Sequence, residues 1–274
     1  MRPKPFPPSP VPELVNGTVS VSLAPPLAHL VIDRPPDNAL SFQIVADLAA
    51  AVAKVDGEPD LRVGILSGAG GTFCGGTSLK ELEAMGPKPL LAAAQMGQDV
   101  AWRIEHSEKI WIAAVEGVAR GGGFDLALAC DLLVASEPAK FESPEVEAGW
   151  IPFFGGTQRI RHAVGRARAR EVILAGTPTT ASDGYSMGFV NRVTPPGRAY
   201  AAAEELAQTI AARPWPAVRA AKRVLVEQLD KPYRNGFVLE AQFLASVVAQ
   251  RRPRPPNGSV SRGGSLASDP TARP

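Results

Sequence analysis

The chain has 274 residues, and 45% of them are hydrophobic, which is enough for a sizeable buried core. Its 29 basic and 27 acidic residues give a formal net charge of +2, a balance that favours neither nucleic acid nor a membrane surface as the main partner. The only cysteines, Cys74 and Cys130, predict no disulfide framework, and free thiols fit a reducing, cytoplasmic compartment. The three histidines lie far apart and no apolar run is long enough to cross a membrane, so neither a metal site nor a transmembrane span is expected.

The first half of the chain predicts strands that alternate with helices. Proline is dense in residues 1–14, which predicts a flexible leader rather than a helix. Two strand-like runs joined across Pro25 and Pro26 predict a hairpin, and Ser41 predicts the N-cap of the first helix. The expected strands cover 18–23, 29–33, 61–67, 110–115 and 132–135, and the expected helices cover 44–55, 79–85, 90–104 and 123–130. This alternation predicts an α/β fold whose parallel strands are buried on both faces.

The second half of the chain predicts mostly helix. Helices are expected near 165–174, 200–212, 217–229 and 236–250, with prolines between several of them. From residue 251 onward almost no apolar residue occurs, which predicts disorder. The expected divisions are therefore a leader at 1–14, a core at 15–195, a helical region at 196–250 and a disordered tail at 251–274.

Two glycine-rich segments, 73–79 and 121–125, each follow an apolar, strand-like run. Glycine lets a backbone approach a ligand closely, so two such turns can direct two free N–H groups at one developing oxyanion. Asp125 and Glu145 are then candidate proton carriers beside that site. Taken singly, each glycine segment could also be only a tight turn between a strand and a helix.

These segments belong to a longer, ordered set of motifs. In chain order the set covers 31–35, 38–40, 63–68, 73–79, 112–117, 121–123, 126–131, 144–145 and 155–159. In that order the motifs resemble the crotonase superfamily, the enoyl-CoA hydratases and isomerases, over residues 19–250. The resemblance implies an α/β fold with a crotonase-like ββα spiral core, followed by a C-terminal helical region.

The resemblance also implies catalytic roles for four residues. The backbone amides of Thr77 and Gly122 match the two donors of the family's oxyanion hole. Glu145 and Asp125 match the two glutamates between which hydratases hold a water, whereas isomerases can work with an acid at the position of Glu145 alone. Asp125 is one methylene shorter than the usual glutamate, and an acid that complements the start of a helix explains it equally well.

Substrate contacts follow from the same resemblance. Coenzyme A is part of the substrate, an acyl-CoA thioester, so no separate cofactor and no metal are implied. The residues expected to bind substrate are Asn38, Ala39, Leu40, Gly75, Gly76, Lys80, Gly121 and Phe153. Lys80 is almost as well explained as a surface lysine at the start of a helix, next to Glu81 and Glu83.

The chain departs from the family pattern at three places. Phe153 replaces a glycine that helps hydratases to position the catalytic water; it either narrows that spot or packs away from substrate. Ser78 replaces an acid that often braces the first glycine loop. The sequence after residue 250 lacks the helical ending that helps other members to close the CoA site.

These observations lead to one main expectation and two alternatives. We expect an enoyl-CoA hydratase that adds water to a 2-enoyl-CoA, because two carboxylates suit the addition of water. Phe153 favours the first alternative, a 3-enoyl-CoA to 2-enoyl-CoA isomerase. The second is a catalytically weak homologue that acts as a binding or assembly partner. The family also implies a homotrimer or hexamer.

Overall fold

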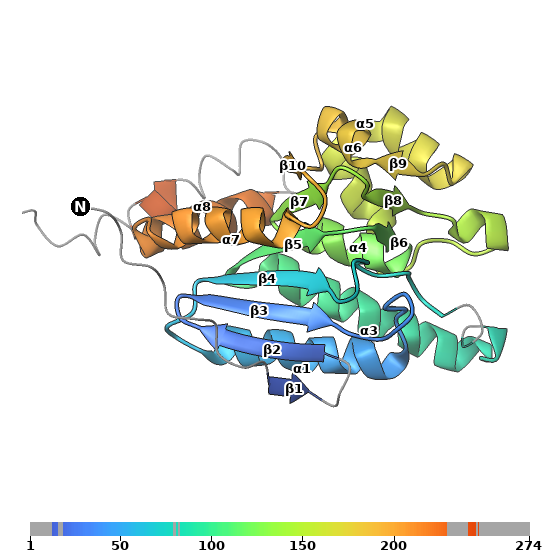
Figure 1. Ribbon diagram of the computed structural model, residues 1–274, viewed down its shortest axis with the longest axis horizontal. Helices are drawn as coiled ribbons and strands as arrows, with labels where there is room; N and C mark the ends of the chain where they lie inside the picture. The colour runs from blue at the N-terminus through green and yellow to red at the C-terminus, as the bar shows by residue number, and fades with distance from the viewer. Residues whose placement is uncertain are drawn as a thin grey trace, which may run out of the picture.

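The computed structural model describes residues 13–15, 19–78, 81, 83–228, 241–244 and 246. Within them the backbone forms two β-sheets surrounded by helices (Figure 1). The large sheet has the strand order β1 (Glu13–Val15), β2 (Val19–Ala24), β3 (Leu27–Ile32), β4 (Val63–Gly68), β5 (Ile110–Val115), β7 (Leu132–Ser136) and β10 (Arg192–Thr194). The small sheet has the order β6 (Val118–Arg120), β8 (Lys140–Glu142) and β9 (Thr179–Thr180).

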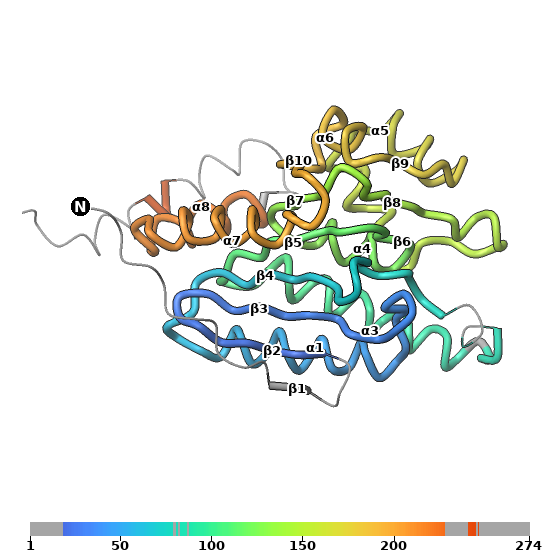
Figure 2. The backbone as a smooth tube through the Cα atoms, viewed as in Figure 1, coloured from blue at the N-terminus to red at the C-terminus, as the bar shows by residue number. Residues whose placement is uncertain are grey.

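Helices lie on both faces of the large sheet. The helical elements of the described residues are α1 (Phe42–Gly57), α3 (Pro87–His106), α4 (Gly122–Ala129), the 3-10 turn η1 (Glu145–Ala148), α5 (Gly156–Ala175), α6 (Ala181–Met187), α7 (Ala199–Ala211) and α8 (Trp215–Gln228). Helix α7 packs on β4, β5 and β7, whereas α1 and α3 contact each other on the opposite face. Figure 2 shows the course of the backbone from the N-terminus in blue toward the C-terminus in red.

The alternation of side chains along β5 explains the two layers. Ile110, Ile112 and Ala114 join the apolar cluster under α7, while Trp111 and Val115 join the larger cluster on the other face. All six residues of β5 are buried, as a parallel strand covered on both faces requires. The strands from β3 through β10 in the large sheet are parallel, and the predicted α/β fold is confirmed.

The start of the chain follows the sequence pattern closely. Strands β2 and β3 form the expected antiparallel hairpin, with Val21 opposite Leu30. Ser41 caps α1, since its side-chain oxygen accepts a hydrogen bond from the amide of Ile44 at 3.3 Å. The buried residues of α1 recur at helical spacing and face the core.

Two sharp turns bring β5 to the start of α4. Gly117 (φ +59°) ends the turn from β5 into β6, and Gly121 (φ +49°) ends the turn from β6 into α4. Both angles lie in the left-handed region, which glycine enters without steric cost. The second glycine-rich segment is therefore a turn from the short strand β6 into α4.

The sequence pattern missed several short elements. The strands β6, β8, β9 and β10 and the helix α6 were not predicted, and α5 begins at residue 156, with non-helical backbone at Gly165. Helices α7 and α8 confirm the expected C-terminal helical region. Most of the expected leader, most of the expected helix at 236–250 and the whole tail at 251–274 lie outside the described residues; residues 13 and 14 of the leader belong to β1.

Candidate active site

The two glycine-rich segments lie next to each other in space. The first follows β4 and the second follows β6, and a parallel bridge pairs Cys74 with Ala119. The amide of Cys74 donates to Val118 O at 2.9 Å, and the amide of Arg120 donates to Cys74 O at 2.9 Å. Backbone hydrogen bonds thus fix the register of one loop against the other.

The residues at 38–40 border the first loop on its other side. Leu40 forms a parallel bridge with Thr77; its amide donates to Gly76 O at 2.7 Å, and its carbonyl accepts from the amide of Ser78 at 3.2 Å. Three motifs that are far apart in the sequence therefore form one surface. All three motifs contain residues that the sequence predicts to bind substrate.

The two loops approach each other closely at two glycines. Gly76 has φ +92°, and a Cβ atom there would lie 2.7 Å from the carbonyl oxygen of Arg120. A Cβ atom at Gly122 would lie 3.0 Å from Oγ1 of Thr77. Thr77 and Gly122, the two predicted amide donors, are therefore neighbours across the junction.

The amide of Gly122 is free of the helix that it begins. As the first residue of α4 it has no intrahelical acceptor, and the positive end of the helix dipole adds to its N–H group. Within the described part of the chain, the amide of Thr77 makes no backbone hydrogen bond outside regular helices and strands. Two donors on adjacent loops are what stabilisation of an oxyanion needs.

Glu145 lies against the second glycine loop. It begins the 3-10 turn η1 directly after Pro144, and a Cβ atom at Gly121 would lie 2.8 Å from its Oε1 atom. Its Oε2 atom is buried and has no hydrogen-bond partner among the described residues. Burial raises the pKa of the carboxyl group of Glu145, and the positive charge of Arg120 partly offsets that rise.

A cavity of about 320 Å³ joins Glu145 to both loops. Its lining residues are Gly75, Gly76, Thr77, Arg120, Gly121, Pro144, Glu145, Glu147, Ala148, Trp150 and Phe153. Such a size is at the lower end of the range for small-molecule sites in proteins. Five of the predicted substrate or catalytic residues besides Glu145 therefore line one cavity: Gly75, Gly76, Thr77, Gly121 and Phe153.

Asp125 lies deeper, on the first turn of α4. It is 1% exposed and is not among the residues that line the cavity. Its Oδ2 atom accepts a hydrogen bond from the amide of Phe154 at 3.1 Å. The backbone of Gly156 approaches Oδ1, where a Cβ atom would overlap it, but Oδ1 makes no hydrogen bond of good geometry with a described residue.

The two acids influence each other. Burial raises the pKa of Asp125 to about 7, and the negative charge of Glu145 adds to this rise. The amides of Gly156 and Phe154 and the charge of Arg159 act in the opposite direction. Burial therefore disfavours ionisation of both carboxyl groups, and the charge of Glu145 adds to this effect at Asp125.

The remaining predicted substrate residues differ in their surroundings. The side-chain amide of Asn38 donates to the carbonyls of Ala69 (2.9 Å) and Thr72 (2.7 Å), and its oxygen accepts from the amide of Arg34, so this side chain holds the loop after β4. Ala39 is partly exposed; its carbonyl accepts from the guanidinium of Arg34. Lys80 lies outside the described residues.

Sequence reasoning missed two residues next to the site. Phe154 follows Phe153 and is 2% exposed; its Cδ2 atom would lie 3.2 Å from a Cβ atom at Gly122. Gly97 in α3 faces the same ring, and a Cβ atom there would overlap it. The departure from the family pattern at Phe153 was a signal for its neighbour Phe154. A lone glycine within a helix was the only signal for the second.

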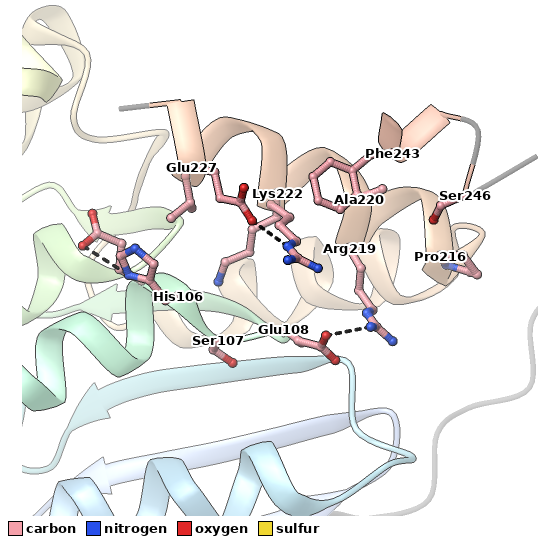
Figure 3. Close-up of a pocket in the computed structure, with 13 residues that line it drawn as sticks. His106, Ser107, Glu108, Pro216, Arg219, Ala220, Lys222, Glu227, Phe243 and Ser246 are labelled. Carbon is pink, nitrogen blue, oxygen red and sulfur yellow. Dashed lines mark hydrogen bonds and ion pairs between the residues drawn. The ribbon is translucent and has the colours of Figure 1, made fainter. Parts of the chain in front are cut away.

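A second cavity lies between α8 and the end of α3, away from the two loops. Figure 3 shows Lys222, Arg219 and Glu227 among the residues around it. Its basic groups are already paired: Arg219 with Glu108 at 2.7 Å, Lys222 with Asp131 at 2.8 Å and Arg223 with Glu227 at 2.6 Å. This pairing leaves little net charge to attract an anion, and the loop cavity remains the candidate site.

Among the described residues, no cluster of three or more potential metal ligands occurs. Cys74 and Cys130 are free thiols, as the sequence predicted. No described helix is both long and apolar enough to span a bilayer.

Comparison with known proteins agrees with this geometry. The family model described as enoyl-CoA hydratase/isomerase matches residues 25–259. The enoyl-CoA isomerase/hydratase fer4 of Mycosarcoma maydis is 37% identical over 225 residues, which cover 77% of this chain and 81% of fer4.

Solved structures give the same result. The crystal structure of an enoyl-CoA hydratase from Bacillus anthracis matches with a TM-score of 0.82 and 32% identity, over 85% of this chain and 92% of that chain. An enoyl-CoA hydratase from Polaromonas sp. JS666 matches with a TM-score of 0.82 and 28% identity, over the same shares of the two chains. With the ordered motifs, the family-model match over most of the chain and these relatives in agreement, the chain belongs to the enoyl-CoA hydratase/isomerase family of the crotonase superfamily.

Proposed function

We propose that this protein is an enoyl-CoA hydratase, which adds water to a 2-enoyl-CoA thioester through an enolate. The observation that carries the proposal is the position of Glu145, which lines one cavity together with the loops that hold Thr77 and Gly122. A carboxyl group beside two convergent amides suits chemistry in which charge develops on a carbonyl oxygen while a proton moves nearby.

The two amides form the oxyanion hole in this proposal. The thioester oxygen accepts hydrogen bonds from the N–H groups of Thr77 and Gly122. As the enolate forms, that oxygen gains negative charge, and both hydrogen bonds strengthen. The start of α4 adds the positive end of a helix dipole to the donor at Gly122.

The two acids supply the base and the acid that hydration needs. Asp125 Oδ1 and Glu145 Oε2 are both buried without a hydrogen-bond partner among the described residues, and the charges of the two groups interact. A substrate water bound between them would satisfy both oxygens. Hydration needs one of the two groups as a carboxylate, which accepts a proton, and the other as a carboxylic acid, which donates one.

The proposed reaction begins when the oxygen of the water bonds to the β-carbon and Asp125 accepts a proton from that water. The electrons of the carbon–carbon double bond then move toward the thioester oxygen, which becomes the enolate oxygen. Glu145, which reaches the cavity, then donates its proton to the α-carbon, and the enolate collapses to the 3-hydroxyacyl thioester. After the product leaves, Asp125 releases its proton to water and Glu145 takes one up, which restores both groups. When Glu145 is protonated its repulsion of Asp125 disappears, which favours ionisation of Asp125.

Isomerisation is the second candidate, and two observations favour it. Asp125 is not among the cavity-lining residues, whereas Phe153 is. If Phe153 excludes water from the cavity, Glu145 can move a proton between two carbons of a 3-enoyl-CoA without help from Asp125.

One set of assays tests both functions. Purified protein is incubated with crotonyl-CoA or with a 3-enoyl-CoA, and the products are followed by absorbance and mass. Hydration is expected in the wild type, with a loss of on the order of 10² or more in Glu145→Gln and in Asp125→Asn. Isomerisation that survives in Asp125→Asn, without hydration in the wild type, would assign the second function. Turnover of neither thioester would leave a binding or assembly role.

The family resemblance also supports two coarser proposals. We keep the prediction of a homotrimer or hexamer, which light scattering on the purified protein tests directly. We also keep a cytoplasmic location, which fits a reduced state of both free thiols.

A further inference from the structure

A small apolar chamber adjoins the cavity at Phe153. Its walls include Leu40, Val45, Ala93, Phe153 and Phe154, and Thr77 lies at its edge. The free volume is about 10 Å³, close to the minimum for a single water molecule. Phe153 and Thr77 line both spaces, so the chamber begins where the proposed oxyanion hole ends.

The ring of Phe154 is part of the wall of this chamber. It is 2% exposed, and its Cδ2 atom comes close to the position that a Cβ atom at Gly122 would take. The ring of Phe153 meets it edge to face, with centroids 5.1 Å apart and an interplanar angle of 86°. Two aromatic rings therefore close the apolar side of the site.

Gly97 makes room for the ring of Phe154. It lies in the interior of α3, where glycine is a poor helix former, and it is buried. Any larger residue would overlap Cδ1, Cε1 and Cγ of Phe154. The absence of a side chain at residue 97 thus lets an aromatic ring reach from α3 to the start of α4.

We propose that Phe154, admitted by Gly97, is the residue that restricts the acyl group of the substrate to a short chain such as butenoyl. The inference rests on the proposed function, because it requires the thioester oxygen to lie between the amides of Thr77 and Gly122. An acyl chain that extends from that point into the apolar chamber meets the two rings, and longer chains have no room there. The preference for short acyl chains therefore arises because the two rings fill the space that a longer chain needs, and not from a polar contact.

Binding of saturated acyl-CoA esters tests the inference without turnover. Calorimetry with butanoyl-, hexanoyl-, octanoyl- and decanoyl-CoA compares the wild type with Phe154→Ala. In an open apolar pocket each added methylene strengthens binding, whereas in the wild type we expect affinity to fall by about tenfold or more from butanoyl to octanoyl. In Phe154→Ala we expect octanoyl-CoA to bind at least as tightly as butanoyl-CoA.

Two further variants keep the result interpretable. Phe154→Leu preserves most of the packing and is expected to give an intermediate selectivity, so the test survives if the alanine variant does not fold. Phe189→Ala is the matched control: this buried ring packs on Phe124 and Phe141 instead of lining the chamber, and its loss should leave the chain-length preference as in the wild type.

The outcomes separate the inference from the function on which it rests. Equal or rising affinity with chain length in the wild type would overturn the inference, and so would an unchanged preference in both Phe154 variants. Failure of every ester to bind would instead overturn the acyl-CoA function itself. A fall in affinity with chain length that Phe154→Ala reverses would support the inference even if the reaction proved to be isomerisation.

Discussion

The carboxyl group of Glu145 lies next to the backbone of Gly121. A Cβ atom at residue 121 would lie 2.8 Å from Oε1 of Glu145, and the backbone there has φ +49°. The acid that is proposed to donate the proton is therefore positioned by the same turn that begins α4. Placement of Glu145 and of the Gly122 amide depends on one glycine.

We predict that Gly121→Ala lowers kcat/KM for crotonyl-CoA by about 10²-fold or more. The added methyl group displaces the carboxylate and strains the turn, and a shift of roughly 1 Å in a catalytic group is enough for a loss of this size. Steady-state kinetics measures the effect, with circular dichroism to show that the fold is retained.

The matched control for this change is Gly70→Ala. Gly70 also has a positive φ, +66°, but no atom lies within 4 Å of the position of its Cβ. The control should lose stability from backbone strain and keep its activity. Equal activity losses in the two variants would mean that strain alone, and not contact with Glu145, explains the effect.

The glycine-rich loops of the candidate site could be recognised in the sequence, because their motifs reflect local requirements of the backbone. Gly76 and Gly121 need positive φ, and Ser41 needs a side chain that caps a helix. Each of these requirements restricts the residue type at one position, so it can be recognised in the sequence without knowledge of the fold. The central strands of the large sheet were equally visible, because β4 and β5 are almost entirely buried runs of six residues without a charged side chain.

The missed features depend on contacts between distant segments. Strands β6, β8 and β9 have three, three and two residues, too few for a periodic pattern to show. The contact of Gly97 with Phe154 joins residues on different helices and loops. The burial of the Asp125 side chain could not be predicted from the sequence either, because it depends on how the loop at 153–156 packs over α4.

The raised pKa of Asp125 predicts a pH-dependent stability. Its ordinary value is 3.8 and burial raises it to about 7 in the folded protein. Between these values the folded state binds more protons than the unfolded state, so this group makes the protein less stable as pH rises from about 4 to about 7. The penalty then stays constant at higher pH.

Asp125→Asn removes that titration. We expect the variant to gain stability relative to the wild type as pH rises through this window, by up to about 4 kcal/mol for a shift of roughly three pKa units. Urea denaturation at several pH values measures the difference. A constant difference from pH 4 to pH 8 would show that Asp125 titrates normally.

A buried ion pair between Lys222 and Asp131 ties α8 to the large sheet, and its loss should be costly. Lys222 is 7% exposed; its ammonium group donates to Asp131 Oδ2 at 2.8 Å and to Lys109 O at 2.7 Å. We predict that Lys222→Met destabilises the protein by about 3 kcal/mol, because Asp131, whose side chain is only 18% exposed, is left without its cation. Urea denaturation measures the loss.

The control for this prediction is Arg223→Met on the same helix. Its partner is Glu227 at 2.6 Å, and the guanidinium side chain is 62% exposed. An exposed pair of this kind contributes little, so the change should cost less than about 1 kcal/mol. Similar losses of stability in the two variants would mean that any substitution in α8 destabilises the protein and that the pair of Lys222 and Asp131 contributes no more than an exposed pair.

The contact between Gly97 and Phe154 predicts strong non-additivity. Gly97→Ala alone forces a methyl group into the ring of Phe154 and should cost about 1–3 kcal/mol, although alanine is the better helix former. Phe154→Ala alone should cost about 3–5 kcal/mol through the cavity that it leaves. In the double variant the clash is absent, so Gly97→Ala should then be neutral or stabilising.

A double-mutant cycle by urea denaturation measures this coupling. Gly57→Ala supplies the reference for helix propensity, since Gly57 ends α1 and no atom lies within 4 Å of its Cβ position. Additive losses would show that Gly97 does not make room for the ring. A coupling of more than about 1 kcal/mol would establish that a helix glycine in α3 and an aromatic residue of the site loop form one packing unit, which is the condition for Phe154 to define the length of the acyl chain.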